Sequence, residues 1–300
     1  MDRRPRFSAG PPRNLPRQPR RGRRHPGGRL RTPARRGPDA RRRAPVLRQG
    51  RPHRRPPHRR QPPRRRRPSL SAPRRPGPDL VGIHHAAGWT AVVIAHLDGP
   101  HPDLSPASSD PDQIWALLDK LTYSPAPPPY TAAAAATPSG AAGLQGWNQL
   151  LADPPGDLEP EVRNRLHELA ELEAAWPGLA HSDRIVHGDL RADNMVRDHD
   201  RGVTFVDWAH ATTGPACIDA VSLAPQLILA GHAPQDIARL LDEHPATATD
   251  PLASTAFLAA LTGHWHRNAR KPAPPGAPGL RAYQHRAATA GIALLSLRMN

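Results

Sequence analysis

The 300-residue chain contains few lysines, glutamates or cysteines, and no long apolar runs. Its first lysine is Lys120, its first glutamate is Glu159 and its one cysteine is Cys217. A single cysteine excludes an internal disulfide framework, and no stretch approaches the roughly 20 apolar residues needed to span a bilayer. The N-terminus also lacks the apolar core of a signal peptide. We therefore expect a cytoplasmic protein that has no membrane partner.

Basic residues are concentrated at the N-terminus. Residues 1–80 hold 28 of the 40 arginines, 18 of the 40 prolines and three acids, a formal charge of +25, whereas the remaining 220 residues carry −9. The only aromatic residue of this segment is Phe7, so it cannot bury enough apolar surface to offset the entropy of ordering. We expect a disordered arm that could contact the phosphates of nucleic acid non-specifically.

Apolar periodicity predicts mostly helices in the second half of the chain. One short strand is expected at residues 91–94, before the turn signal at 98–100. Asp110 is the expected N-cap of the first helix, and Pro177 is expected to end the second. Residues 124–143, rich in proline and alanine, should form a loop. The predicted helices cover residues 111–121, 162–176, 235–243, 252–265 and 280–297.

A group of polar residues around two short apolar stretches has the character of a catalytic centre. Asp189 and Asn194 precede the first stretch, Asp207 follows the second, and a polar turn at 198–202 separates the two. If the stretches pair as an antiparallel hairpin, Asn194 and Asp207 lie at its open end. Two oxygen ligands there would suit Mg²⁺ bound to nucleotide phosphates, and Asp189 could accept the proton of an attacking hydroxyl.

This arrangement resembles the catalytic loop of the aminoglycoside phosphotransferase family. The His-Gly-Asp sequence at 187–189, followed by Asn194, matches the pattern H-G-D-x-x-x-x-N, and Asp207 is similar to the family's metal-binding aspartate. Residues 214–219 resemble the next family segment, G-x-P-x-x-D, whose last residue, here Asp219, supports the catalytic loop. The resemblance implies an α+β, protein-kinase-like fold with a mainly helical C-lobe and a catalytic β-hairpin.

The same resemblance implies the roles of five residues in the reaction. Asp189 would be the catalytic base, and Asn194 and Asp207 would be the Mg²⁺ ligands. His187 would orient the loop. Arg191, two residues after the base, would stand where a cation can reach the γ-phosphate.

Residues 89–99 resemble the strand and hinge that join the two lobes of such enzymes, and backbone groups near Ala95 and Leu97 would then meet the adenine of ATP. The resemblance covers about residues 80–300. It divides this part of the chain into a residual N-lobe strand and hinge at 81–100 and a phosphotransferase C-lobe at 101–300.

An N-lobe of this family needs a lysine and a glutamate that hold the nucleotide phosphates. Because neither residue type occurs before Lys120, we expect the N-lobe to be absent from this chain. One hypothesis is that residues 1–80 are an out-of-frame translation of a GC-rich gene, since arginine, proline, glycine and alanine dominate them. Finding no strand-rich segment with a central lysine in the other two upstream frames would sink this idea.

Two functions remain open at this point. The first is ATP- and Mg²⁺-dependent phosphate transfer to a hydroxyl of a small molecule. The second is a catalytically inactive kinase remnant, or a binding protein, whose basic arm contacts nucleic acid. The charge of −9 would suit a cationic substrate, although a solvated acidic surface explains it equally well. The sequence indicates neither the substrate nor the oligomeric state.

Overall fold

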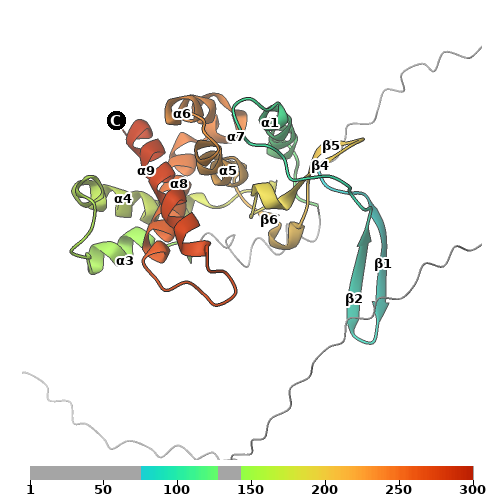
Figure 1. Ribbon diagram of the computed structural model, residues 1–300, viewed down its shortest axis with the longest axis horizontal. Helices are drawn as coiled ribbons and strands as arrows, with labels where there is room; N and C mark the ends of the chain where they lie inside the picture. The colour runs from blue at the N-terminus through green and yellow to red at the C-terminus, as the bar shows by residue number, and fades with distance from the viewer. Residues whose placement is uncertain (1–75, 128–142, 300) are drawn as a thin grey trace, which may run out of the picture. The chain divides into compact units, whose positions relative to one another are not determined.

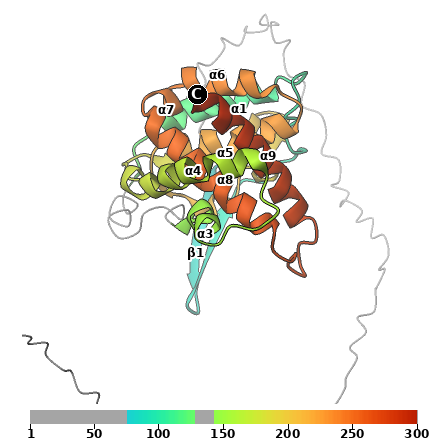
Figure 2. The same ribbon diagram turned by 90° about the vertical axis from the view of Figure 1, so that its left-hand side faces the viewer.

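The computed structural model describes residues 76–127 and 143–299. The expected basic arm, its nucleic-acid contact and most of the loop expected at 124–143 lie outside these residues. The chain divides into a unit at residues 1–65 and a unit at residues 66–300, and all described elements belong to the second. The second unit is rich in helices (Figures 1 and 2).

The first two strands, β1 (Leu80–Ala86) and β2 (Trp89–Ile94), form an antiparallel hairpin (Figure 1). Its two-residue turn consists of Ala87 and Gly88, whose φ angles are 49° and 80°, the left-handed conformation that tight hairpin turns require. We predicted only the second strand, because Gly82 and the histidine pair after Ile83 interrupt the apolar pattern of the first. The hairpin exposes its large apolar side chains: Leu80, Val81, Ile83, Trp89, Val92, Val93 and Ile94.

The remaining strands form two small antiparallel sheets. β3 (Ile185–Val186) pairs with β6 (Thr212–Thr213), and β4 (Met195–Asp198) pairs with β5 (Gly202–Phe205). The short helices η2 (Ala192–Asn194) and η3 (Trp208–His210) lie next to these strands in the sequence. All six elements fall within residues 185–213, between the long helices Pro160–Leu179 and Cys217–Leu229, which is the α+β arrangement that we expected.

Helix α1 (Asp110–Thr122) agrees with the predicted helix at 111–121 except at its start. The N-cap is Ser109, so the prediction that Asp110 caps this helix was wrong. The buried Asp110 carboxylate instead accepts the Asp103 N–H at 3.0 Å and pairs with the Arg197 guanidinium at 3.1 Å. It therefore joins α1 to the preceding loop and to β4.

Helix α3 (Gly146–Ala152) was not predicted, and it depends on a carboxylate from the next helix, α4 (Pro160–Leu179). Glu173 of α4 accepts the backbone N–H groups of Trp147 at 3.1 Å and Asn148 at 2.8 Å. α4 continues through Pro177, where we expected it to end, because proline in the last turn forfeits only one helical hydrogen bond.

The core is formed by the long helices of the C-terminal half. α8 (Pro251–Ala269) packs against α9 (Leu280–Arg298), α4 and α3, and α9 also packs against α5 (Cys217–Leu229) (Figures 1 and 2). Gly263 of α8 allows α3 to approach closely, since a Cβ at this position would lie 2.5 Å from the Trp147 ring. Between α5 and α8 in the sequence lie α6 (Pro234–Glu243) and α7 (Pro245–Ala248).

Two further properties of the described residues bear on the expectations. None of the described helices is both long enough and apolar enough to cross a membrane. Cys217 is buried at the start of α5, and burial raises the pKa of its thiol to about 12. It packs as a small apolar side chain of the core.

Candidate active site

β4 and β5 pair as the antiparallel hairpin that we expected. Met195 is opposite Phe205 and Asp198 is opposite Gly202, and the Val206 N–H donates to the Asn194 carbonyl at 2.8 Å. The Asp198 carboxylate closes the turn by accepting two backbone N–H groups at 3.0 Å each. Asn194 therefore precedes the first strand and Asp207 follows the second, so both are at the open end of the hairpin.

The catalytic loop is held by a buried carboxylate from α5. Asp219 accepts the N–H of His187 at 2.7 Å and the N–H of Gly188 at 2.9 Å. Burial raises the pKa of Asp219, and the two amide hydrogen bonds oppose that rise. Gly188 has a φ of 79°, and a Cβ there would lie 2.5 Å from the His210 carbonyl oxygen. The contacts of Asp219 are the structural support that the resemblance implied.

His187 connects this loop to the segment after β5. Its Nε2 atom lies 2.8 Å from the Val206 carbonyl oxygen, and its ring centroid is 4.8 Å from that of Trp208 and 6.3 Å from that of Phe205. The side chain is fully buried. The position of His187 is thus fixed by three neighbours.

Asn194 fixes Asp189, the expected base. The Asn194 Nδ2 group donates to the backbone carbonyl of Asp189 at 2.7 Å and to its Oδ2 atom at 3.1 Å. Because these bonds use the amide nitrogen, the amide oxygen of Asn194 is the atom available as a metal ligand. Asn194 thus holds the expected base next to its own amide oxygen, which is one of the two expected metal ligands.

Asp207 is the second expected metal ligand. It is exposed and has φ and ψ angles of 59° each, a left-handed conformation that is rare for residues other than glycine. Such strained residues cluster at functional sites. Within the described residues, no group of three or more histidine, cysteine, aspartate or glutamate side chains could hold a metal ion. The donor set of Asn194 and Asp207 fits Mg²⁺, which takes few protein oxygens and completes its shell with phosphate and water.

Arg191 is engaged by carboxylates. Its guanidinium binds Asp193 through two hydrogen bonds of 2.9 and 2.8 Å, and it lies 3.8 Å from the Asp189 carboxylate. The bond to Asp193 is the main cause that raises the pKa of Arg191, and it lowers the pKa of Asp193. To reach a γ-phosphate, Arg191 would have to exchange Asp193 for the phosphate.

The end of the expected hinge, at residues 98–100, is hydrogen-bonded to β4. The Arg197 N–H donates to the Pro100 carbonyl at 2.8 Å, and the Asp98 N–H donates to the Asp198 carboxylate at 3.2 Å. The Ala95 N–H already donates to the Asp79 carbonyl at 2.8 Å. Contacts of the hinge with adenine would therefore come from the Ala95 carbonyl and from the backbone of Leu97.

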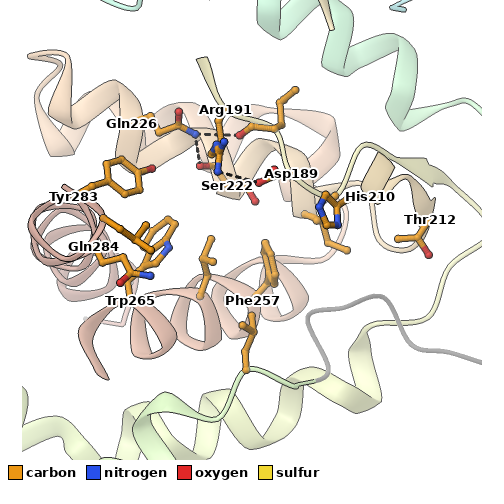
Figure 3. A pocket seen from close by; sticks show the side chains of 16 residues that line it. Asp189, Arg191, His210, Thr212, Ser222, Gln226, Phe257, Trp265, Tyr283 and Gln284 are labelled. Atoms are coloured by element: carbon orange, nitrogen blue, oxygen red, sulfur yellow. Dashed lines mark hydrogen bonds and ion pairs between the residues drawn. The ribbon is translucent and has the colours of Figure 1, made fainter. Parts of the chain in front are cut away.

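A cavity of about 530 Å³ lies next to Asp189 and Arg191. Figure 3 shows Tyr283, Trp265 and Gln284 at one end, and His210 and Thr212 at the other. We call it the α8–α9 cavity, since α8 and α9 supply its aromatic and much of its apolar lining. Asp189 is the expected site residue that links this cavity to the metal pair, because neither Asn194 nor Asp207 lines it.

Apart from Asp189 and Arg191, the cavity residues were not predicted as part of the site. Phe257, Trp265 and Tyr283 come from helices that are distant from the catalytic loop in the sequence. Among the tryptophans of the described residues, Trp115, Trp147 and Trp176 are buried in the core. Trp265 is half-buried and lines the cavity. Its helical spacing is the same as that of a core residue, so the sequence carried no signal for it.

Two solved aminoglycoside phosphotransferases are similar to the chain. One is a thermostable mutant of APH(4)-Ia in ternary complex with ADP and hygromycin B (15% identity, 73% of this chain and 77% of that chain, TM-score 0.40). The other is from Alicyclobacillus acidocaldarius (16% identity, 74% and 77%, TM-score 0.38). No curated protein matches the chain.

The family comparison covers most of the sequence. The model of the phosphotransferase enzyme family matches residues 22–271. The matched range contains the catalytic loop, the β4–β5 hairpin and Asp219. It begins upstream of residue 80, where we expected the resemblance to start. The chain belongs to the phosphotransferase enzyme family, whose protein-kinase-like fold we expected from the catalytic loop.

Proposed function

We propose that the chain transfers the γ-phosphoryl group of ATP, in the presence of Mg²⁺, to a hydroxyl group of a small molecule. The observation that carries this proposal is the position of Asp189. Its backbone and carboxylate are both held by Asn194, and its side chain also lines the α8–α9 cavity. One carboxylate is thus next to an expected metal ligand and to a cavity that can hold an acceptor.

Each expected residue has a defined task in this proposal. Asp189 orients the acceptor hydroxyl and takes its proton. Asn194 and Asp207 hold the cation, which would offset charge on the phosphates. His187 and Asp219 keep the loop in position and do not touch the reacting atoms. Arg191 is the cation next to the base.

Adenine would be held at the hinge. Ala95 offers a backbone carbonyl, and Leu97 offers its backbone groups, at the point where the chain passes from β2 towards α1. Hydrogen bonds of this kind fix the base of a nucleotide without a charged side chain. The described part of the chain therefore contains candidates for the metal ligands, for the catalytic base and for the groups that contact adenine.

Titration calorimetry of Mg²⁺-ATP into the purified chain tests the proposal. We expect saturable heat for the native chain, its loss in Asp207→Ala, and its loss when Mg²⁺ is omitted. Asp153→Ala is the matched control, since it removes one exposed carboxylate at the end of α3, away from the hairpin. This control should bind Mg²⁺-ATP with the native affinity.

Two results would contradict the proposal. Equal binding with and without Mg²⁺, or equal binding by Asp207→Ala and the native chain, would remove Asp207 from the metal site. The absence of any saturable heat would mean that this chain does not bind nucleotide. That second result would support the reading of the chain as a catalytically inactive remnant.

A further inference from the structure

Half of the residues that line the α8–α9 cavity are aliphatic or aromatic, and its three aromatic rings, Phe257, Trp265 and Tyr283, come from α8 and α9. These side chains favour ligands with an apolar surface, because burying such a surface is what stabilises the complex. The apolar and aromatic lining residues are Leu144, Leu190, Ile218, Phe257, Leu261, Trp265, Leu280 and Tyr283.

The charged lining is sparse and is not negative overall. Asp189 is the one carboxylate among the lining residues that the structure describes, and the Arg191 guanidinium lies 3.8 Å from it. His210 is the other basic residue of the lining. Burial raises the pKa of Tyr283, so its phenol is neutral at physiological pH. No carboxylate of the lining is therefore free of a cation.

The internal segment outside the described residues does not change this balance. Residues 128–142 contain neither aspartate nor glutamate. In the sequence they lie between α1 and Leu144, which lines the cavity. Whatever this segment contacts, it brings no carboxylate.

A substrate with several ammonium groups would be poorly matched to these surroundings. Each ammonium that leaves water needs a carboxylate or several strong acceptors. Trp265 and Tyr283 could attract a cation through their ring faces, but Arg191 repels a cation in the same cavity. Neutral hydrogen-bonding groups are present instead, in Ser222, Thr212 and Gln284.

From this lining we infer that the acceptor is a neutral molecule with a hydroxyl-bearing end and an aromatic or apolar body, and that it is not a polycation. The hydroxyl would lie at Asp189, and the body would lie against Phe257, Trp265 and Tyr283 (Figure 3). This inference rests on the proposed function, since it names the substrate class of the same site.

A pair of ligands that differ by one charge tests the inference. Phenyl β-glucoside is neutral, and phenyl β-glucosaminide carries an ammonium in place of one hydroxyl. In calorimetric titrations without nucleotide, at a pH where the amine is protonated, we expect the glucoside to bind about tenfold more tightly or better. Kanamycin, a polycation that is rich in hydroxyls, should give no saturable binding over the same concentrations.

A charge-switch variant provides the internal control. Leu280 lines the cavity and is the first residue of α9, where an acid is compatible with the helix. We expect Leu280→Asp to shift the preference towards phenyl β-glucosaminide about tenfold, whereas the neutral Leu280→Asn should not. Leu252→Asp adds the same charge at an exposed position outside the cavity and should keep the native preference.

The outcomes separate this inference from the proposed function. Tighter binding of kanamycin or of the glucosaminide by the native chain, or no binding of any of the three ligands, would overturn the inferred ligand class. Phosphate transfer from ATP is measured separately. Transfer to kanamycin would support the proposed function and overturn the inference. Binding of the glucoside, without transfer to any acceptor, would leave the ligand class standing and count against the function.

Discussion

Two aspartates of the candidate site, Asp189 and Asp219, differ in burial and in their hydrogen-bond partners. Asp189 is partly exposed and lines the cavity, so it can meet a substrate. Asp219 is fully buried and accepts two backbone N–H groups of the loop that carries Asp189. The first residue is suited to chemistry and the second to holding the loop.

Replacing each of these aspartates by asparagine should separate the two tasks. Asp219→Asn puts an amide NH₂ against a backbone N–H, so it should cost about 1–3 kcal/mol of unfolding free energy and also lower turnover. Asp189→Asn should keep stability within about 0.5 kcal/mol, because the residue is not buried. Its turnover should fall by about 10²–10⁴-fold while Mg²⁺-ATP affinity is retained. Urea unfolding and ATP consumption measure the two effects.

A result in which Asp219→Asn has native stability would show that the two hydrogen bonds do not hold the loop. Native turnover in Asp189→Asn would show that the base has been assigned to the wrong residue. Added Mg²⁺ should restore neither the stability nor the turnover of Asp219→Asn, since Asp219 is not one of the expected metal ligands.

At the scale of elements, α3 depends on a side chain of α4. α3 has seven residues, too few to be stable without tertiary contacts. Glu173 is buried and accepts two of its first N–H groups, and the Trp147 indole N–H donates to the Ala259 carbonyl of α8 at 2.7 Å. The position of α3 is therefore set by two other helices.

We expect Glu173→Ala to destabilise the chain by about 1–3 kcal/mol, because the buried N–H groups of α3 would lose their acceptors. Glu173→Gln should cost less, since its amide oxygen still accepts one of them. The matched control is Glu171→Ala, an exposed glutamate of the same helix, which should change stability by less than about 0.5 kcal/mol. Urea denaturation followed by tryptophan fluorescence gives all three values. Equal losses of stability in Glu171→Ala and Glu173→Ala would refute the role of Glu173 as the acceptor for the first N–H groups of α3.

The sequence was sufficient for the catalytic hairpin and for most long helices. Asn194 and Asp207 could be placed at one end of a hairpin because the polar turn between them fixes the register. The apolar residues that recur at helical spacing in α1, α4, α6, α8 and α9 predicted the central turns of these helices. Errors occurred at the ends of elements, as at Asp110 and Pro177, where local signals were overridden by contacts with other segments.

The α8–α9 cavity could not have been predicted from the sequence. Trp265 and Leu261 have the helical spacing of core residues, and only the packing of α8 against α9 leaves part of this stripe open. β1 was missed for a related reason. Its histidines and glycine have low strand propensity, and its pairing with β2 depends on the turn at 87–88.

At the scale of the whole molecule, the net charge of residues 81–300 differs from the charge of the α8–α9 cavity. The 220 residues after position 80 carry −9, which would suit a cationic substrate. The cavity next to the base has one carboxylate, and that carboxylate is close to Arg191. Most acidic side chains of these 220 residues therefore lie outside the lining of the cavity, so their net charge does not indicate the ligand.

Two buried histidines and one half-buried histidine should make the stability of the whole molecule sensitive to acid. Burial is the main cause that lowers the pKa of His244, His264 and His266. These histidines stay neutral in the folded chain at a pH where the unfolded chain takes up protons. Stability should therefore decrease as pH falls below the ordinary histidine pKa of about 6.5, and it should be fully present above that value.

Urea midpoints at about pH 7.5 and about pH 5.5 test this expectation, with the lower midpoint expected at the lower pH. His266→Gln should reduce the difference between the two midpoints, because it removes one of the three groups. The carboxylate of Glu159, 3.1 Å from the His266 ring, offsets part of the effect of burial. Identical midpoints at both pH values would contradict the prediction.

The buried thiol of Cys217 has a practical consequence for measuring motion in this protein. Its pKa of about 12 leaves almost no thiolate at neutral pH, and the thiolate is the form that reacts with maleimides. Any cysteine introduced at an exposed position would then be labelled selectively in the folded chain, with the native residue left in place. With one label on β2 and a second on α9, the distance between the strand hairpin and the helices could be measured with and without nucleotide.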